Sequence, residues 1–307
     1  MNKNHRFPDF LCIGAQKAGT TWLYDNLKKH PDLGLPDVKE LHYFDSRERI
    51  LNHNLLRRLL RPHSVPFWLK KSLDEWRNPI FKKQIKSHLA DGNLVKIISY
   101  LDDFYNLNND RLYSDIFSSI PEKITGEITP DYSALNKDSV SHIYQIMPEV
   151  KIIFILRNPI DRAWSHARMD FSQENRNFAS LCDRDFINHF NSRGSRKRSN
   201  YLKTLETWEF YYPEGQFLIC FFDQLAKKPQ QFIHRICKFL NIESYSDYMQ
   251  QINTKATNSY AEDYKNKIPQ ELSVYLAKFY YPELEQLSAR FGGYATQWLD
   301  SANKLLS

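Results

Sequence analysis

The sequence predicts an α/β fold built on a central parallel sheet flanked by helices. Two observations support this prediction: four short apolar runs punctuate the chain, and helix-prone segments separate them. In three of the runs the apolar residues are continuous rather than alternating, which is typical of strands buried on both faces of a parallel sheet. Strands that alternate with helices favour a doubly wound arrangement. The predicted strands are residues 10–13, 123–128, 151–156 and 216–222.

Helical segments fill the intervals between the predicted strands. An Asn158-Pro159 pair follows the third strand, and it predicts a helix start because Asn is a preferred N-cap and Pro suits the first helical turn. In later segments apolar residues recur at helical spacing. The predicted helices are residues 20–29, 159–170, 201–211, 229–240 and 282–291.

Residues 51–112 differ from the rest of the chain, because they are helix-prone, strongly charged and without a clear strand. They are predicted to form a helical insertion over one edge of the sheet, either as packing or as a lid on the substrate side. The length of 307 residues suffices for one large α/β domain or two small ones. No internal repeat divides the chain, so we expect a single domain over residues 1–307.

The bulk composition indicates a globular protein that suits an anionic ligand. Hydrophobic residues make up 42% and charged residues 25%, and the formal net charge is +6. This balance also fits a nucleic-acid partner. However, the densest basic run, residues 193–198, has no interleaved aromatic residues and is predicted to be a solvated loop. We therefore expect no nucleic-acid partner.

Cysteine usage and hydropathy argue against several other classes. The four cysteines lie far apart with no CxxC pair, so neither a zinc knuckle nor a dithiol redox site is expected, and no other cluster of metal ligands stands out. Cys12 and Cys220 lie inside apolar runs and are predicted to be buried. Residues 1–9 are polar, and no stretch approaches the ~20 apolar residues of a membrane span. A cytoplasmic protein without a membrane partner is expected.

The first predicted strand leads into a segment with the features of an anion-binding loop. Residues 14–21, GAQKAGTT, join this strand to a helix. Glycines at both ends let the backbone curl and expose its N–H groups, and the helix adds its own N-terminal N–H groups. The glycine spacing matches the nucleotide triphosphatase loop GxxxxGK[ST], but Thr20 stands at the lysine position and Lys17 lies inside the loop. This predicts a phosphate site in which Lys17 reaches the bridging oxygen of a leaving group.

A carboxylate and an imidazole follow in residues 38–44, VKELHYF. If this segment is extended, Glu40 and His42 point to the same side, because side chains alternate along a strand. Such a pair suits removal of a proton from a hydroxyl or an amine. The alternative is an exposed glutamate and a surface histidine on an edge strand.

The third predicted strand ends at Arg157, and Ser165 lies about two turns into the helix that follows. The carboxyl end of a strand is where open α/β sheets bind ligands. A guanidinium can hold a phosphate through two hydrogen bonds, and a serine hydroxyl can add a third. The segment therefore predicts a phosphate clamp, with an ordinary strand-to-helix turn as the alternative.

Taken together and in order, these motifs resemble the sulfotransferases that use 3′-phosphoadenosine 5′-phosphosulfate (PAPS) as donor. Residues 14–23 are similar to the family's GxxKxGTTWL loop for the 5′-phosphosulfate. Residues 39–44 are similar to the KExHFF stretch of its heparan-sulfate branch. Residues 156–167 resemble its LRxPxxRxxSxY pattern for the 3′-phosphate, although Ala167 replaces the final aromatic residue.

Two further segments support the resemblance. Residues 126–132 are similar to the family's GExTPxY strand end, where Glu127 either orients the lysine, contacts the acceptor or is structural. Residues 198–201 resemble the RGxY loop that wraps the nucleotide, with Ser199 in place of the glycine. The motifs span most of the chain outside residues 51–112.

The resemblance implies a P-loop-like fold and a role for each matched residue. Lys17 is the implied charge partner of the leaving oxygen. Glu40 is the implied base, aided by His42. Aryl-type members use a histidine as base, so the choice between the two stays open here. Nucleotide contacts are implied for Gln16, Lys17, Ala18, Gly19, Thr20, Thr21, Trp22, Arg157, Ser165, Arg198, Ser199 and Tyr201.

The expected activity is a one-step transfer of the sulfuryl group from PAPS to a hydroxyl or amine of a carbohydrate or small natural product, without a metal. A nucleotide kinase is the first alternative, but it would require lysine at position 20 and a carboxylate that holds magnesium. A non-catalytic binder of adenine nucleotides or nucleic acid is the second. Neither the identity of the acceptor nor an oligomeric state follows from these motifs.

Overall fold

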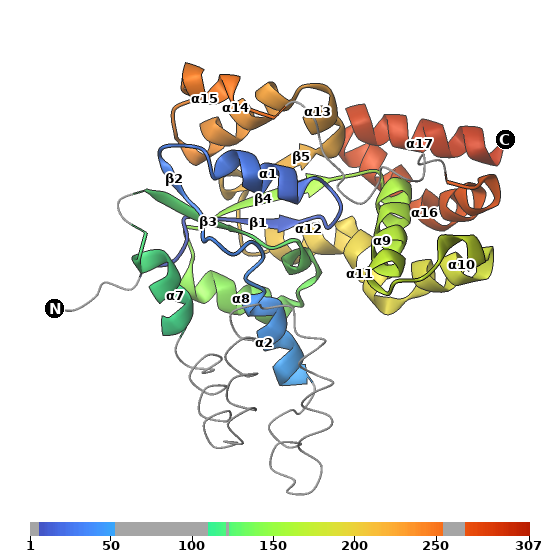
Figure 1. Ribbon diagram of the computed structural model, residues 1–307, viewed down its shortest axis with the longest axis horizontal. Coiled ribbons are helices and arrows are strands. Elements are labelled where there is room, and N and C mark those ends of the chain that lie inside the picture. Colours follow the sequence, from blue (N-terminus) through green and yellow to red (C-terminus); the bar gives the residue numbers. More distant parts are fainter. Residues whose placement is uncertain (1–5, 53–109, 121–122, 254–267) are drawn as a thin grey trace, which may run out of the picture.

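A five-stranded parallel sheet forms the centre of the molecule (Figure 1). The computed structural model describes residues 6–52, 110–120, 123–253 and 268–307. The strand order is β2-β3-β1-β4-β5, and every neighbouring pair is parallel. The strands are β1 Phe10–Gly14, β2 Leu33–Gly34, β3 Ile124–Ile128, β4 Lys151–Leu156 and β5 Phe217–Phe221.

The four predicted strands are present, with small changes at their ends. Their continuous apolar character has the expected cause, because β1 is buried at every position and β4 at every position after Lys151. Cys12 and Cys220 are buried within these strands, as predicted. The short strand β2 was not predicted, since two residues carry no recognisable pattern.

Helices cover both faces of the sheet. In Figure 1, α1 and α14 lie above the sheet and α8 and α12 lie below it. The helices are α1 Thr20–Leu27, α2 Tyr43–Asn52, α7 Arg111–Ser118, α8 Lys137–Ile146, α9 Pro159–Gln173, α10 Asp183–Asn191, α11 Arg193–Ser199, α12 Tyr201–Glu209, α13 Phe222–Lys227, α14 Pro229–Leu240, α15 Ser246–Gln250, α16 Gln270–Phe291 and α17 Gly293–Leu306. Short 3₁₀ turns are η1 Pro130–Ala134, η2 Phe178–Ser180 and η3 Glu214–Gln216.

The predicted helix at 282–291 is only the second half of α16. Pro282 suggested a helix start, yet it lies inside the helix. The preceding turns bury Leu272, Leu276 and Tyr280 at a spacing of four residues. This continuous apolar stripe stabilises the helix across the proline.

The basic run at 193–198 is helical, so the prediction of a solvated loop was wrong. It forms most of α11, and the Ser192 side chain caps the helix by accepting a hydrogen bond from the Ser195 N–H. Serine is a preferred N-cap, but it lies one residue before the basic run and was overlooked. The predicted insertion at 51–112 lies almost wholly outside the described residues, apart from its ends in α2 and at 110–112.

The sheet topology brings three chain segments to one edge. Because β1 lies between β3 and β4, the segments after these strands leave the sheet at its carboxyl edge, where open α/β folds bind ligands. They are the loop before α1, the turn η1 and the start of α9. Within the described part of the chain, no helix has the length and apolar character to cross a membrane.

Candidate active site

The loop between β1 and α1 has the backbone of an anion site. Gly19 is the N-cap of α1 with φ 84°, and no side chain caps the helix there. A β-carbon at Gly19 would lie 2.9 Å from Cδ1 of Leu225, so both the left-handed backbone and the close packing require glycine. No side-chain cap therefore occupies the first amide groups of α1, and amides of this kind bind anions at helix starts.

Lys17 and Arg157 lie together at this loop. Arg157 Nη1 donates a hydrogen bond to the Lys17 carbonyl oxygen at 2.6 Å, and its guanidinium lies 4.6 Å from the ring centre of Phe222. Burial, and then the positive charge of Arg157, lower the pKa of the Lys17 amine to about 8. Burial also lowers the pKa of Arg157. Two partly desolvated cations at a helix N-terminus form a strong site for an anion.

A series of hydrogen bonds through Tyr201 holds the backbone that carries Arg157. The Tyr201 hydroxyl donates to the Arg157 carbonyl oxygen at 2.9 Å. The Tyr201 N–H donates to Oε1 of Glu283 on α16 at 2.7 Å, and burial raises the pKa of Glu283 to about 7. Tyr201 is fully buried. Its side chain therefore holds the strand end that carries Arg157, and does not lie in the open.

The other predicted nucleotide residues are spread over the loop and two helices. Thr20 is buried and Thr21 exposed at the start of α1, and Ser165 is partly buried on α9. Trp22 is buried, and its Nε1 donates to the Asn253 carbonyl at 2.8 Å. Gln16 is buried, and its Oε1 has no hydrogen-bond partner among the residues described. Ala18, within the loop, is fully buried.

The side chains of Arg198 and Ser199 diverge. Arg198 Nε donates to Oδ1 of Asp131 at 2.5 Å. Ser199 is fully buried, and its Oγ accepts hydrogen bonds from Arg162 Nε at 2.7 Å and from the Tyr280 hydroxyl at 2.9 Å. Its side chain is therefore committed to the packing between α9, α11 and α16.

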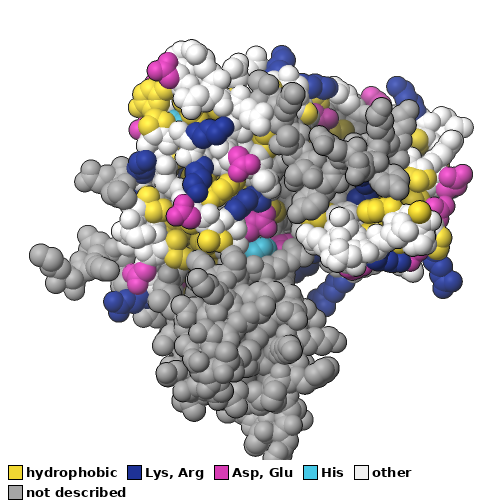
Figure 2. Space-filling view, in the orientation of Figure 1, with side chains coloured by type: hydrophobic (Ala, Val, Ile, Leu, Met, Phe, Trp, Pro, Cys, Tyr) yellow, Lys and Arg dark blue, Asp and Glu magenta, His cyan; other side chains and the backbone are white. Residues whose placement is uncertain are grey.

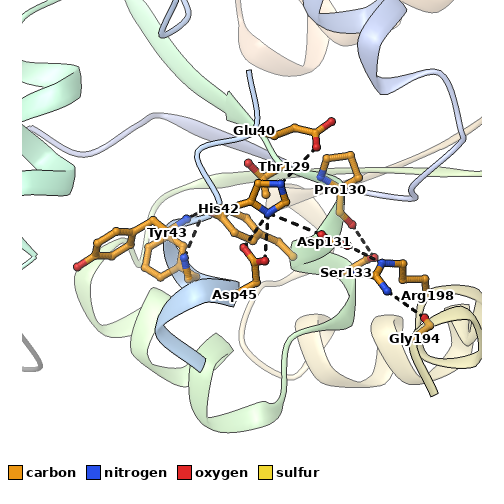
Figure 3. Close-up of polar contacts among 12 residues, drawn as sticks. Glu40, His42, Tyr43, Asp45, Thr129, Pro130, Asp131, Ser133, Gly194 and Arg198 are labelled. Carbon is orange, nitrogen blue, oxygen red and sulfur yellow. Dashed lines mark hydrogen bonds and ion pairs between the residues drawn. The ribbon is translucent and has the colours of Figure 1, made fainter. Parts of the chain in front are cut away.

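Glu40 and His42 lie together, but not on an extended segment. Both residues have left-handed backbones, with φ of 61° and 53°, so the expected strand alternation does not occur. His42 Nε2 nevertheless lies 3.4 Å from Oε2 of Glu40 (Figure 3). The left-handed turn replaces the period-two geometry and brings the two side chains to contact. Glu40 also pairs with Lys39.

Carboxylates surround His42. Its Nδ1 lies 3.0 Å from Asp45 Oδ2 and 3.6 Å from Asp131 Oδ2. Burial opposes the charge, but the hydrogen bonds to Asp45 and Glu40 and the charges of Asp45 and Asp131 raise the pKa of His42 to about 9. For Glu40, burial is outweighed by the hydrogen bond to His42 and by Lys39, so its pKa is lowered. At neutral pH the histidine is thus a cation and the glutamate an anion, and of the two only Glu40 can accept a proton.

Asp45 and Asp131 are the residues that sequence analysis missed. They connect His42 to Arg198 in one charged chain (Figure 3). Asp131 lies inside a motif that had been noticed, at 126–132, and Asp45 follows His42 by three residues. The spacing of Asp45 from His42 was an available signal, whereas Asp131 meets His42 and Arg198 only in the folded chain.

Glu127 belongs to the structural framework. It is 2% exposed, and its oxygens accept hydrogen bonds from the hydroxyls of Thr129, Tyr113 and Tyr132 at 2.6, 2.6 and 2.8 Å. Burial raises its pKa. Three donors from three neighbours satisfy the carboxyl group, and this supports the structural alternative for Glu127.

Charged side chains of both signs and a histidine gather at the centre of one face of the molecule (Figure 2). The arrangement has two halves: a cationic loop with Lys17 and Arg157, and a carboxylate–imidazolium pair at Glu40 and His42. Electrostatic stabilisation of a leaving anion and removal of an acceptor proton are the chemistry that these halves can supply.

Comparison with known proteins relates the chain to sulfotransferases. Residues 8–247 match the family described as "Sulfotransferase family". The chain is 24% identical over 257 residues to the human bifunctional heparan sulfate N-deacetylase/N-sulfotransferase 2, covering 79% of this chain and 23% of that protein. It is 23% identical over 274 residues to mouse carbohydrate sulfotransferase 15, covering 82% and 47%. The chain thus spans no more than about half the length of these two relatives.

Solved structures share the fold. A sulfotransferase from Alicyclobacillus acidocaldarius superposes with a TM-score of 0.59 at 20% identity, covering 95% of this chain and 98% of that one. Mouse sulfotransferase SULT7A1 in complex with PAP superposes with a TM-score of 0.53 at 14% identity, covering 98% and 91%. These likenesses confirm the predicted P-loop-like parallel sheet with flanking helices. With the family match over most of its length, the chain belongs to the sulfotransferase family.

Proposed function

We propose that this sulfotransferase uses PAPS as donor and modifies a hydroxyl or amine of a carbohydrate or small natural product. The observation that carries the proposal is the placement of Lys17 and Arg157 at the uncapped start of α1, within one charged site that also holds Glu40. The lysine environment includes the charges of both Arg157 and Glu40. A single-domain organisation over residues 1–307 and a cytoplasmic location are part of the proposal.

The residues present fit a phosphorylated nucleotide. Arg157 Nε is buried and has no hydrogen-bond partner among the described residues, so it is a donor that lacks an acceptor oxygen. Gly19 leaves open backbone at the start of α1. We assign the 5′ side of the donor to residues 16–22 and its 3′-phosphate to Arg157 and Ser165, with Arg198 beside them. When bound, PAPS supplies an activated sulfuryl group on a phosphate leaving group.

The chain's own residues then act on both sides of the transfer. Glu40 takes the proton from the acceptor, and the His42 imidazolium orients this carboxylate. Lys17 and the N-terminal amides of α1 stabilise the negative charge that grows on the leaving oxygen. Because the groups are held by packed elements, much of the rate enhancement comes from positioning.

Radiolabelled PAPS with a panel of sugar, amine and phenol acceptors tests the proposal. We expect labelled product from at least one acceptor. Phosphoryl transfer from ATP with magnesium, but no turnover of PAPS, would instead support a kinase. Tight PAPS binding without turnover across the panel would support a non-catalytic nucleotide binder. Thr20, at the position of the kinase lysine, argues against the kinase result.

Replacement of Arg157 by alanine should weaken binding of the desulfated donor, 3′-phosphoadenosine 5′-phosphate (PAP), more than binding of adenosine 5′-phosphate, which lacks the 3′-phosphate. A hydrogen bond to a charged group contributes about 1.5–3 kcal/mol, and this difference should appear only with PAP. Calorimetric titration of both nucleotides measures it. Arg193→Ala on the exposed start of α11 is the control. An equal loss for the two nucleotides would show that Arg157 does not contact the 3′-phosphate.

Replacement of Tyr201 by phenylalanine should weaken PAP binding by about twofold to tenfold, since it removes one hydrogen bond that holds Arg157. Tyr212→Phe is a matched control, because that buried hydroxyl also donates to a backbone carbonyl, of Met147, at 3.2 Å. The two variants should lose similar thermal stability, and only Tyr201→Phe should lose PAP affinity. If both bind PAP like the parent chain, Tyr201 does not position the site.

A further inference from the structure

Two histidines and an aspartate converge outside the residues assigned to the transfer reaction. His166 and Asp170 lie one turn apart on α9, and His189 lies on α10. Oδ2 of Asp170 lies 2.8 Å from His189 Nε2 and 3.3 Å from His166 Nε2. The three atoms all lie within 4.8 Å of one another. A single carboxylate oxygen thus faces two imidazole nitrogens.

The helices that carry the cluster are held firmly together. Trp164 and Phe171 of α9 pack against Phe186 of α10, with ring centres 4.9 and 5.2 Å apart. The two histidine rings lie 4.9 Å apart at 70°. A site built on packed helices is preorganised, because its side chains need little further ordering to bind.

The cluster is largely buried but reachable from solvent. His166 is 2% exposed. The Nε2 atoms of His166 and His189 face Asp170, and the opposite ring nitrogens, Nδ1, are buried without a hydrogen-bond partner within the described part of the chain. Asp170, with a side chain 27% exposed, leaves an approach from solvent.

We propose that His166, Asp170 and His189 bind a divalent transition metal ion, Zn²⁺ in the first instance, with a fourth position open to water. Zinc bonds to nitrogen and oxygen of about 2.0–2.2 Å place tetrahedral ligand atoms about 3.3 Å apart. The two separations from Asp170, 2.8 and 3.3 Å, are close to this spacing, and the two histidine nitrogens lie within 4.8 Å of each other. Two imidazoles with one carboxylate favour such an ion over magnesium or calcium, which prefer oxygen ligands.

Nearby charges set the strength of the site. Arg162 and Arg198 lower the affinity for a cation, although Asp131 neutralises Arg198 through their ion pair. No metal is expected from the sequence, because no cluster of metal ligands, CxxC-type spacing included, stands out along the chain. That pattern cannot show ligands on two separate helices, with His189 and Asp170 19 residues apart.

Bound metal should act as a brace between α9 and α10, since three ligands from two helices become one unit. Metal binding at this site does not require the proposed donor or acceptor. The first measurement is calorimetric titration of Zn²⁺ into the full chain after treatment with a chelator. One ion per chain and a rise in the thermal midpoint are expected. With Co²⁺, visible absorption of tetrahedral intensity should appear.

Variants separate this site from other metal contacts. His189→Gln and Asp170→Asn should each weaken Zn²⁺ binding at least about tenfold, as loss of one ligand does, and abolish the Co²⁺ absorption. His234→Ala on α14, where the exposed ring bonds Ser244, is the matched control and should bind like the parent chain. His189 is more exposed than His166, so His189→Gln should fold. Absence of binding, or binding that is unchanged in His189→Gln, would overturn the proposal.

Discussion

Replacement of Lys17 by alanine is expected to lower turnover by about 10²–10³-fold, the usual loss when one group that stabilises a developing anion is removed. Lys17 lies in the donor loop beside Arg157, and its amine is partly buried without belonging to the hydrophobic core. Burial lowers the pKa of this lysine, so its charge costs stability in the free protein at neutral pH. The variant should therefore unfold at the same temperature as the parent chain or higher.

Steady-state rates with labelled PAPS and thermal unfolding of the same preparations test both halves of this expectation. Lys28→Ala is the control, since it removes an exposed lysine at the other end of α1. Loss of activity together with loss of stability would indicate misfolding. A turnover like that of the parent chain would remove Lys17 from the mechanism.

The same lysine predicts an alkaline limit to activity. Its folded-state pKa of about 8 means that the free enzyme loses this charge as pH rises through that value. With an acceptor that does not titrate there, kcat/KM should fall on the alkaline side near this pH. In Lys17→Arg the fall should move to higher pH, because a guanidinium keeps its proton. An unchanged pH profile in the arginine variant would show that another group causes the alkaline fall in kcat/KM.

Replacement of Glu40 by glutamine should suppress turnover strongly, by about 10²–10⁴-fold for loss of a general base, while PAP affinity stays nearly unchanged. Glutamine keeps the size and the hydrogen-bonding ability of the side chain but does not accept the proton. Rates under saturating PAPS and PAP titration measure the two effects. Retention of most of the rate would show that Glu40 is not the base.

His42→Ala should lower the free energy of unfolding, unlike Glu40→Gln, which should mainly lower turnover. His42 is 3% exposed, and its pKa is raised to about 9. The stability that its charge contributes is complete below the unfolded value of about 6.5 and is lost as pH rises through the folded value. Alanine leaves Asp45 and Asp131 without this cation, and breaking a buried pair commonly costs about 3–5 kcal/mol. A stable, inactive His42→Ala variant beside an active Glu40→Gln variant would instead make histidine the base.

Much of the fold was predictable because it depends on local pattern. The strands around Cys12 and Phe154 are continuous apolar runs, and their burial on both faces follows directly. The loop at Lys17 and the strand end at Arg157 were recognisable because their chemistry is encoded by residues adjacent in sequence. Their contact follows from the pairing of β1 with β4.

The remainder depends on long-range contacts or unusual backbone. The left-handed conformations at Glu40 and His42 have no clear sequence signal, since residues other than glycine are uncommon there. The assignment of the base needed Asp45 and Asp131, whose charges act only once the chain has folded around the imidazole. The hydrogen bond from Tyr201 to the Arg157 backbone also forms only in the folded chain, so the sequence pattern could not distinguish this contact from a contact with a ligand.

The central place of β1 also bears on how the protein folds. Lys17 and Arg157 are 140 residues apart along the chain, and they meet only when β1 pairs in parallel with β4. Pairings of such high contact order form slowly, because a long loop must close before the contacts stabilise it. The contact between the donor loop and Arg157 should therefore form late in folding. During synthesis it cannot form before β4 has left the ribosome. Pulsed hydrogen exchange during refolding should show the amides of β1 and β4 becoming protected together.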